Sequence, residues 1–355
     1  MPFAPAPPID YHSLLTQRPV TASAPCRVDM GGTLDISTFH YPLRALDPLT
    51  FNIALDLRTT VHLEPYRRGW VHITSTGFPE AVHRVQELPF AHPMGLIFTV
   101  AAYFGVDGVR IGIQSASPPR SALGGSSVAA VALVAALDRV RTSAGVTALS
   151  VARTAWIAHV LEQSVAGVPC GFQDQLAAAF GGVNAWHWTG EAGESPYHQE
   201  ALTMEREFES LERRMLLAYC GEPHVSRDIN GRWVRRFLAG QDRPQWREII
   251  ALTHKFVDSW SVGKVKDACQ AMNQETAIRR RMTPDVLDEM GVALVESAAA
   301  HQCAARFCGA GGGGCIWALG APGAIAGLRS SWGQILAQRE AACLLPVAIA
   351  RQGVC

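Results

Sequence analysis

One stretch of the chain has the residue types of a phosphate-binding loop. Residues 118–127 read PPRSALGGSS and run directly into an apolar, alanine-rich segment at 127–140 that predicts a buried helix. Backbone N–H groups at a helix N-terminus have no intrahelical partner and lie at the positive end of the helix dipole, so this junction could bind a triphosphate. No lysine follows the glycines, which disfavours a P-loop, and the glycine spacing is not that of a dinucleotide-binding fold. The alternative is a loop that only caps the helix.

Two acidic residues in the middle of the chain could hold a metal ion and accept a proton. Glu162 lies near the end of a helix predicted at 151–165, and Asp174 lies between two glutamines at the start of a shorter helix predicted at 173–180. A Gly/Pro turn separates the helices, so the carboxylates could converge, one on Mg²⁺ and the other on a proton. Alternatively, Asp174 only stabilises its helix through the dipole, and Glu162 is a solvated side chain.

A glycine run near the C-terminal end is the third candidate. Residues 308–315 read CGAGGGGC between two strand-like runs, with five glycines within six residues. Each glycine adds an ordering cost of up to about 1 kcal/mol relative to alanine, so stability does not explain the run. We therefore expect a loop that faces a ligand. A flexible hairpin turn is the alternative, although two residues would suffice for one.

The elements that would position these segments divide the chain into two parts. A polar segment at 189–209 separates them and predicts domains at 1–200 and 201–355. In the first part, strand-like runs lie at 21–30, 49–57, 59–64, 109–114 and 183–188, with a further helix at 94–104. In the second part, strands lie at 215–219, 305–308, 315–319 and 344–350, and helices lie at 245–261, 265–278, 284–301 and 321–339. This pattern predicts the α+β class.

The bulk composition limits the possible partners. The 355 residues contain 31 Lys plus Arg and 31 Asp plus Glu, so no net field would attract nucleic acid or an anionic membrane. No apolar run is long enough to span a membrane, and residues 1–8 lack the order of a signal peptide. The nine cysteines are scattered without a C-x-x-C pair, which favours neither disulfides nor structural zinc. We therefore expect a cytoplasmic protein with no nucleic-acid and no membrane partner, of open oligomeric state.

Taken together and in this order, the three segments resemble motifs of the GHMP kinases, the superfamily of galactokinase, homoserine kinase, mevalonate kinase and phosphomevalonate kinase. Its phosphate loop, Pro-x-x-x-Gly-Leu-Gly-Ser-Ser, resembles residues 118–127, with Ala122 where glycine is usual. Residues 171–182 resemble the G-x-Q-D-Q-x-A-A-x-F-G-G segment of sugar 1-kinases, and 308–314 resemble their glycine loop. Within the superfamily, the chain looks most like the D-glycero-D-manno-heptose 7-phosphate kinases, the kinase part of L-fucose kinases and galactokinase.

The resemblance implies a two-domain GHMP kinase fold, with a ribosomal protein S5 domain 2-like N-terminal domain and a ferredoxin-like C-terminal domain. It also implies ATP and Mg²⁺ as cofactors. Asp174 would be the base, and Arg27 would stabilise charge between Asp174 and the γ-phosphoryl group. Ser127 and Glu162 would face Mg²⁺. The nucleotide would also contact Pro119, Leu123, Gly124, Gly125, Ser126 and Ser127, and the acceptor would contact Asp35, Gly31, Gly32, Gly309, Gly311 and Gly312.

The acceptor is the least determined part of the prediction. Asp35 resembles the sugar-binding acid of the family, which implies a kinase for a sugar or sugar phosphate, acting at the anomeric hydroxyl as heptose 7-phosphate 1-kinases do. An acceptor that already carries a phosphate would need a second cationic site, for which Arg120, His224 and Arg227 are candidates. The alternatives are a GHMP kinase for a non-sugar alcohol such as a mevalonate-type acid, and a non-catalytic ligand-binding relative.

Overall fold

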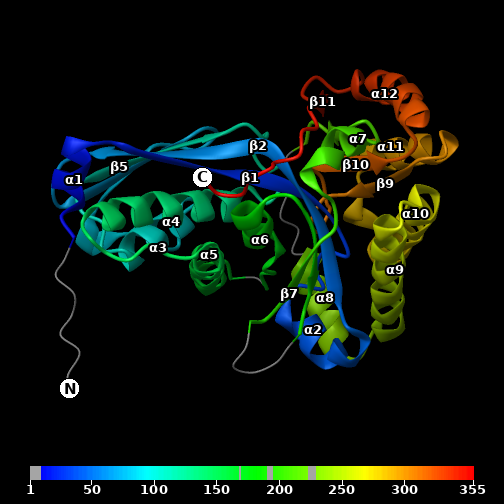
Figure 1. Ribbon diagram of the computed structural model, residues 1–355, viewed down its shortest axis with the longest axis horizontal. Helices are drawn as coiled ribbons and strands as arrows, with labels where there is room; N and C mark the ends of the chain where they lie inside the picture. The colour runs from blue at the N-terminus through cyan, green and yellow to red at the C-terminus, as the bar shows by residue number, and fades with distance from the viewer. Residues whose placement is uncertain (1–8, 168, 190–194, 223–228) are drawn as a thin grey trace.

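The chain folds around two β-sheets that lie next to each other along the long axis of the molecule (Figure 1). The computed structural model describes residues 9–167, 169–189, 195–222 and 229–355. Among these residues, every strand pairing is antiparallel except that of β3 with β5. Two mainly antiparallel sheets with helices packed against them confirm the predicted α+β class.

Two long strands form the centre of the first sheet. Strand β1 (Val20–Met30) pairs with β2 (Leu49–Pro65) along its whole length. The register shifts between Pro25 and Cys26, where proline lacks the N–H that a regular ladder requires. Beyond this irregularity, residues Cys26–Met30 are all buried, so the second half of β1 is covered on both of its faces.

The remaining strands of the first sheet flank this pair in the order β4-β3-β5-β2-β6-β7. They are β3 (Trp70–Ser75), β4 (Ala81–Arg84), β5 (Val109–Ser115), β6 (Val183–His187) and β7 (His198–Ala201). Strand β7 crosses position 200 and pairs with β6, so the first sheet extends one residue past the proposed domain boundary, which itself stays a prediction.

A layer of helices covers one face of the first sheet (Figure 1). Helix α4 (Gly125–Ser143) packs on β1 and β2 and is surrounded by three other helices, α3 (Gly95–Tyr103), α5 (Val151–Val165) and α6 (Gln173–Phe180). Its apolar residues therefore face neighbours on almost every side, which is why this segment is apolar nearly all round.

The second sheet has the order β11-β8-β10-β9 and carries its own helices. Its strands are β8 (Met215–Tyr219), β9 (Ala304–Phe307), β10 (Cys315–Leu319) and β11 (Cys343–Leu345). Helices α10 (Val265–Met282), α11 (Glu289–Ala300) and α12 (Pro322–Leu336) pack against these strands, and α9 (Arg243–Ser261) joins α10 to β2.

Shorter helices complete the described part of the chain. They are α1 (Tyr11–Gln17), α2 (Ser37–Leu43), α7 (Phe208–Glu212) and α8 (Ile229–Leu238), with 3-10 turns at Arg44–Leu46, Val85–Glu87, Glu205–Glu207 and Pro284–Val286. Among the described helices, none is both long and apolar enough to cross a membrane.

The last residues of the chain return from the second sheet to the first. Ile349 forms a bridge with Leu55 of β2, and Cys355 exchanges two backbone hydrogen bonds with Ser23 of β1, at 2.7 and 2.9 Å. The C-terminal residues thus connect the second sheet back to the first (Figure 1).

The structure differs from the predicted elements at several points. The helix predicted at 284–301 is a 3-10 turn at Pro284–Val286 followed by α11. The runs at 49–57 and 59–64 are one strand, because the residue between them, Arg58, stays in the ladder opposite Pro25. The final strand ends at Leu345 instead of continuing to 350, since Pro346 cannot donate to a ladder. Helix α8 was not predicted, because its sequence INGRWVRRFL carries three arginines and a glycine that hide its apolar face.

Candidate active site

A cavity of about 640 Å³ lies where β1, the loop before α4, the start of α6 and the glycine loop meet. Eight of the residues predicted for the site line it: Arg27, Asp35, Pro119, Gly124, Gly125, Ser126, Asp174 and Gly309. The other predicted residues, Gly31, Gly32, Leu123, Ser127, Glu162, Gly311 and Gly312, are outside its lining. Segments more than a hundred residues apart in the chain therefore share one cavity, as the site prediction requires.

Arg27 and Asp174 both line this cavity and bind each other. Arg27 is 3% exposed, and its Nε and one terminal nitrogen each lie 2.7 Å from Oδ1 of Asp174. Burial alone would lower the pKa of Arg27, but Asp174 and Asp29 outweigh it and raise that pKa further. Burial raises the pKa of Asp174, and Arg27 offsets only part of this rise. Asp174 is thus a stronger base than a solvated aspartate, beside a permanent positive charge.

The loop before α4 has an unusual backbone. Arg120 and Ala122 have φ angles of 55° and 62°, in the left-handed region that side chains rarely adopt. The carbonyl of Ala122 accepts a hydrogen bond from Arg27 at 2.8 Å, so this bent loop is held against the Arg27–Asp174 pair. This contact stabilises an alanine at a position where the resemblance to the family leads one to expect glycine.

The start of α4 has the properties of an anion site. A Cβ atom at Gly124 would lie 3.2 Å from the Asp174 carboxyl group, whereas Gly125 has open space within 4 Å. In the described chain, no side chain caps the first turn of α4, so its amides are free for an anion. A triphosphate fits these residues, since the backbone is bare on the cavity side and its N–H groups are unpaired.

Two serines of α4 and Glu162 of α5 form a small oxygen cluster next to this helix start. Ser126 Oγ and Ser127 Oγ donate to the two carboxylate oxygens of Glu162 at 2.7 and 2.6 Å, and Gln175 donates to the second oxygen at 2.6 Å. Burial raises the pKa of Glu162, against the effect of these hydrogen bonds. Among the described residues, no group of three His, Cys, Asp or Glu side chains could hold a metal. One carboxylate with hydroxyls suits Mg²⁺, which takes its other ligands from water and phosphate.

Asp35 also lines the cavity, and its carboxylate is anchored by backbone amides. Its Oδ1 accepts from the Thr33 N–H at 2.9 Å and its Oδ2 from the Gln173 N–H at 3.0 Å. A Cβ at Gly171 would lie 1.7 Å from this carboxylate, so only glycine permits the approach. Burial raises the pKa of Asp35 to about 6.

The glycine loop serves both packing and the cavity. Gly309 and Ala310 line the cavity, in agreement with a ligand-facing loop. Gly311 instead packs on Val286, where a Cβ would lie 2.4 Å from that side chain, and the Gly312 N–H donates to the Val286 carbonyl at 2.8 Å. Gly311 and Gly312 are thus explained by close backbone packing, and their contact with an acceptor stays a prediction.

Gly31 and Gly32 are likewise explained by close packing behind the cavity. A Cβ at Gly31 would lie 2.6 Å from Thr253, and one at Gly32 would lie 2.3 Å from the Asp29 carboxylate. These glycines let the segment that carries Asp35 pass between β1 and the second half of the chain. Their direct contact with an acceptor also stays a prediction.

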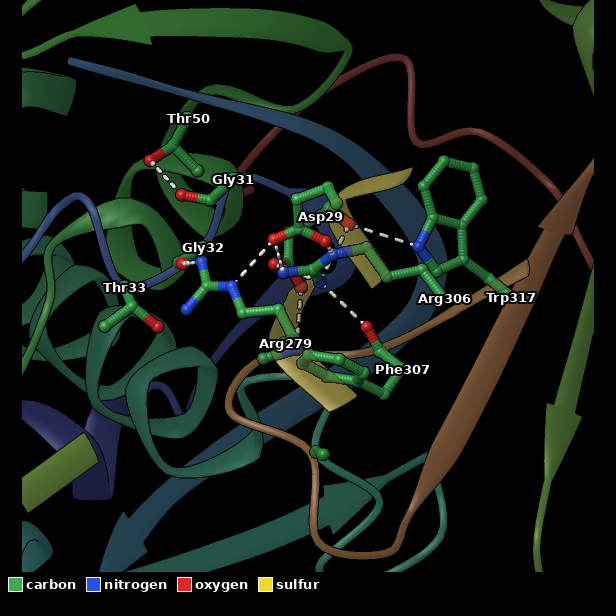
Figure 2. Close-up of polar contacts among 12 residues, drawn as sticks. Asp29, Gly31, Gly32, Thr33, Thr50, Arg279, Arg306, Phe307 and Trp317 are labelled. Carbon is green, nitrogen blue, oxygen red and sulfur yellow. Dashed lines mark hydrogen bonds and ion pairs between the residues drawn. The ribbon is translucent and has the colours of Figure 1, made fainter. Parts of the chain in front are cut away.

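A buried charge network beside the cavity was missed by the sequence analysis (Figure 2). Asp29, Glu275, Arg279 and Arg306 are each 0% exposed. Arg306 binds Asp29 at 2.9 Å and Glu275 at 3.0 Å, and Arg279 binds Glu275 at 2.8 Å. Glu275 and Arg279 look like an ordinary i,i+4 surface pair in sequence. The available signal was Arg306, a lone charge inside the apolar strand run of β9.

The comparisons with known proteins agree with this geometry. Residues 92–182, which hold the loop, Glu162 and Asp174, match the GHMP kinases N terminal domain. The chain therefore carries the N-terminal domain of the GHMP kinases. This confirms the family resemblance, and it supports a kinase for a sugar or another small alcohol, with ATP as the phosphoryl donor that GHMP kinases use. No curated protein sequence matches the chain.

Solved structures of GHMP kinases share the fold over nearly the whole chain. Galactokinase from Lactococcus lactis, complexed with galactose, superposes with a TM-score of 0.75 at 16% identity, covering 97% of each chain. A D-glycero-D-manno-heptose 1-phosphate kinase from Bacteriodes thetaiotaomicron gives 0.67 at 17% identity, covering 94% of this chain and 97% of the other. Mevalonate kinase from Methanococcus jannaschii gives 0.68 at 14% identity, covering 93% and 98%. At these identities the likeness establishes the two-domain GHMP kinase fold alone.

Proposed function

We propose that this protein is an ATP-dependent kinase that phosphorylates a hydroxyl group of a sugar or sugar phosphate at the anomeric position. The observation that carries this proposal is the contact of Arg27 with Asp174 in a cavity that also contains the bare start of α4 and the Asp35 carboxylate. Base, cation, phosphate site and hydroxyl-binding acid are then available to one reaction.

In the proposed reaction, Asp174 accepts the proton of the acceptor hydroxyl. The hydroxyl oxygen forms a bond to the γ-phosphorus of ATP, and the bond from that phosphorus to ADP breaks. Both Arg27 contacts are to Oδ1 of Asp174, which leaves Oδ2 for the hydroxyl. Arg27 stabilises the negative charge on the transferred phosphoryl group, the main requirement of this chemistry. Ser126, Ser127 and Glu162 would hold Mg²⁺, which supplies further positive charge to phosphate oxygens when bound.

The acceptor end of the cavity suits a polyol. Among the described lining residues the cationic side chains are Arg27, already bound to Asp174, and Arg120, in the phosphate loop. Gln173 Oε1 is buried and has no hydrogen-bond partner in the described structure, so it can accept from a hydroxyl, as can Asp35. These two hydrogen-bond acceptors favour a sugar, whereas a hydroxy acid would have to place its carboxylate on Arg120, the one cation of the described lining that is not bound to Asp174.

A phosphate already present on the acceptor would need a cation of its own. Arg120 lines the cavity and is exposed, so it can serve this role. The other two candidates, His224 and Arg227, lie outside the described residues. A heptose 7-phosphate thus belongs in any substrate panel beside free sugars.

The test is a panel of free sugars, sugar phosphates and hydroxy acids incubated with Mg-ATP, scored by ADP release. We expect turnover of sugars and an acid-labile anomeric phosphate in the product, assigned by phosphorus NMR. Turnover of hydroxy acids alone would show that the acceptor class is wrong. ATP binding without turnover of any acceptor would favour the non-catalytic alternative.

A further inference from the structure

The segment that carries Asp35 is held from behind by one arginine of the second half of the chain. Arg279 of α10 donates from a terminal nitrogen to the carbonyl oxygen of Gly32 at 2.6 Å (Figure 2). The N–H of the same peptide group belongs to Thr33 and donates to Asp35 Oδ1 at 2.9 Å. A single peptide unit thus connects the Arg279 guanidinium to the carboxylate that faces the cavity.

This peptide unit adopts a conformation that needs support. Thr33 has a φ of 84°, and a β-branched residue at positive φ is strained by about 1–3 kcal/mol. Asp35 and Arg279 bind the two ends of the peptide that precedes it and hold it in this orientation. A cation on the carbonyl also strengthens the N–H as a donor, because hydrogen bonds in a chain polarise one another.

Arg279 is itself fixed in place. Its guanidinium carbon lies 4.7 and 4.6 Å from the ring centres of Trp233 and Trp246, two rings packed edge to face, and its Nε donates to Glu275. A planar guanidinium can contact aromatic rings and still donate hydrogen bonds in two fixed directions, whereas a lysine ammonium has no such plane. The hydrogen bond from Arg279 to the Gly32 carbonyl therefore has a fixed direction.

We propose that Arg279 is a positioning residue for acceptor binding, which orients Asp35 through the Gly32–Thr33 peptide. The inference rests on the proposed function, since it takes Asp35 to bind the acceptor. Both halves of the chain then contribute to the acceptor site, because Arg279 of the second half orients the Asp35 carboxylate of the first half.

When Arg279 is replaced, the other charged residues of the network still have partners. Glu275 keeps its contacts with Arg306, at 3.0 and 3.4 Å, and Asp29 keeps its own contact with Arg306. Arg279→Met also preserves apolar contact with the two tryptophans. The variant is therefore suited to kinetics, and thermal melting with and without ADP establishes that it folds.

The test measures KM for the acceptor, KM for ATP and kcat in Arg279→Met, Arg279→Lys and the wild type. We expect Arg279→Met to raise the acceptor KM about 10- to 100-fold, the size of a lost hydrogen bond to a charged group, with the ATP KM changed less than about twofold. Arg279→Lys, which keeps the charge, should recover part of this loss. The matched control is Arg280→Met, the neighbouring arginine, which points outward and makes a surface contact with Glu296 at 3.9 Å.

Each outcome separates the inference from the proposed function. If the wild type phosphorylates no sugar, the proposed function is wrong and the inference falls with it. If the wild type is active and folded Arg279→Met keeps its acceptor KM, only the inference is wrong. An equal loss in kcat and in both KM values would also overturn it, because that pattern indicates a general structural role. Should Arg279→Met not fold, Arg279→Lys decides by the same comparison of the two KM values.

Discussion

Two arginine–carboxylate systems lie next to each other in this protein and differ in their access to solvent. The Arg27–Asp174 pair borders the cavity, and the Asp174 side chain is 24% exposed. The network of Asp29, Glu275, Arg279 and Arg306 is sealed from solvent, since each of these side chains is 0% exposed. The chemical groups are the same in both, so the difference comes from their surroundings.

The surroundings shift the acids in opposite directions. Burial raises the pKa of Asp174, Asp35 and Glu162 around the cavity, and their hydrogen-bond and charge partners do not reverse this rise. Burial would also raise the pKa of Glu275, but Arg306 and Arg279 together outweigh it and lower that pKa. The acids around the cavity are thus shifted toward proton exchange, whereas Glu275 is held in its charged form by the two arginines.

The largest expected effect is on turnover, through the Arg27–Asp174 pair that borders the cavity. Asp174→Asn removes the proton acceptor but keeps the size of the side chain, so kcat should fall about 10²- to 10⁴-fold while ATP binding is retained. Steady-state kinetics and nucleotide titration measure the two quantities. Asp47→Asn, at a surface aspartate with a side chain 59% exposed, is the control. Unchanged turnover in Asp174→Asn would remove this residue from the mechanism.

A substitution in the buried network of Asp29, Glu275, Arg279 and Arg306 should lower the unfolding free energy. Glu275→Gln leaves Arg279 and Arg306 buried without their shared carboxylate, which should cost about 3–5 kcal/mol of unfolding free energy. Denaturant unfolding measures the loss. The control Glu296→Gln breaks a surface contact with Arg280 and should cost less than about 0.5 kcal/mol. If both variants lose the same stability, burial does not distinguish the two kinds of pair.

Acceptor binding should depend on pH through Asp35. Burial raises its pKa from 3.8 to about 6, so the carboxylate that accepts hydroxyl protons is lost below pH 6. The acceptor Kd, measured without ATP, should rise about tenfold per pH unit below that point. Asp35→Asn should bind more weakly at pH 7.5 and lose this dependence.

The contribution of Asp35 to stability has the opposite sign. Because the pKa is higher in the folded chain than in the unfolded one, protonation favours folding, and this contribution is lost as pH rises through 6. Between pH 7.5 and pH 5, protonation of Asp35 should therefore not lower the melting temperature. A Kd that tracked the melting temperature would mean that binding is lost through unfolding, and not through the carboxylate.

The smallest effect is expected in the phosphate loop. Ala122 at a φ of 62° is strained by about 1–2 kcal/mol, and glycine would relieve this but lose about 0.5–1 kcal/mol through its freer unfolded chain. Ala122→Gly should therefore raise the unfolding free energy by no more than about 1 kcal/mol, and Ala122→Val should lower it. A clear loss in the glycine variant would show that the alanine methyl group packs productively.

Much of the fold could be predicted because it depends on neighbouring residues. The helices at 151–165 and 173–180 lie where apolar periodicity and glycine boundaries predicted them. Helix α8 and the continuous β2 could not be predicted, because their form depends on distant partners. The same limit applies to the sealed network, whose Glu275–Arg279 pair has the spacing of any solvated helix pair.

By itself, the sequence determined the local chemistry of this protein: a glycine- and serine-rich helix start that exposes amides, an aspartate at the beginning of α6, and a glycine run too costly to be a simple turn. Only the tertiary structure decided that Arg27 contacts Asp174, 147 positions away, and that Arg279 reaches Gly32, 247 positions away. The physical reason is range. Helix starts and turns depend on hydrogen bonds among adjacent residues, whereas a buried charge is stable only where the packed fold supplies its partner.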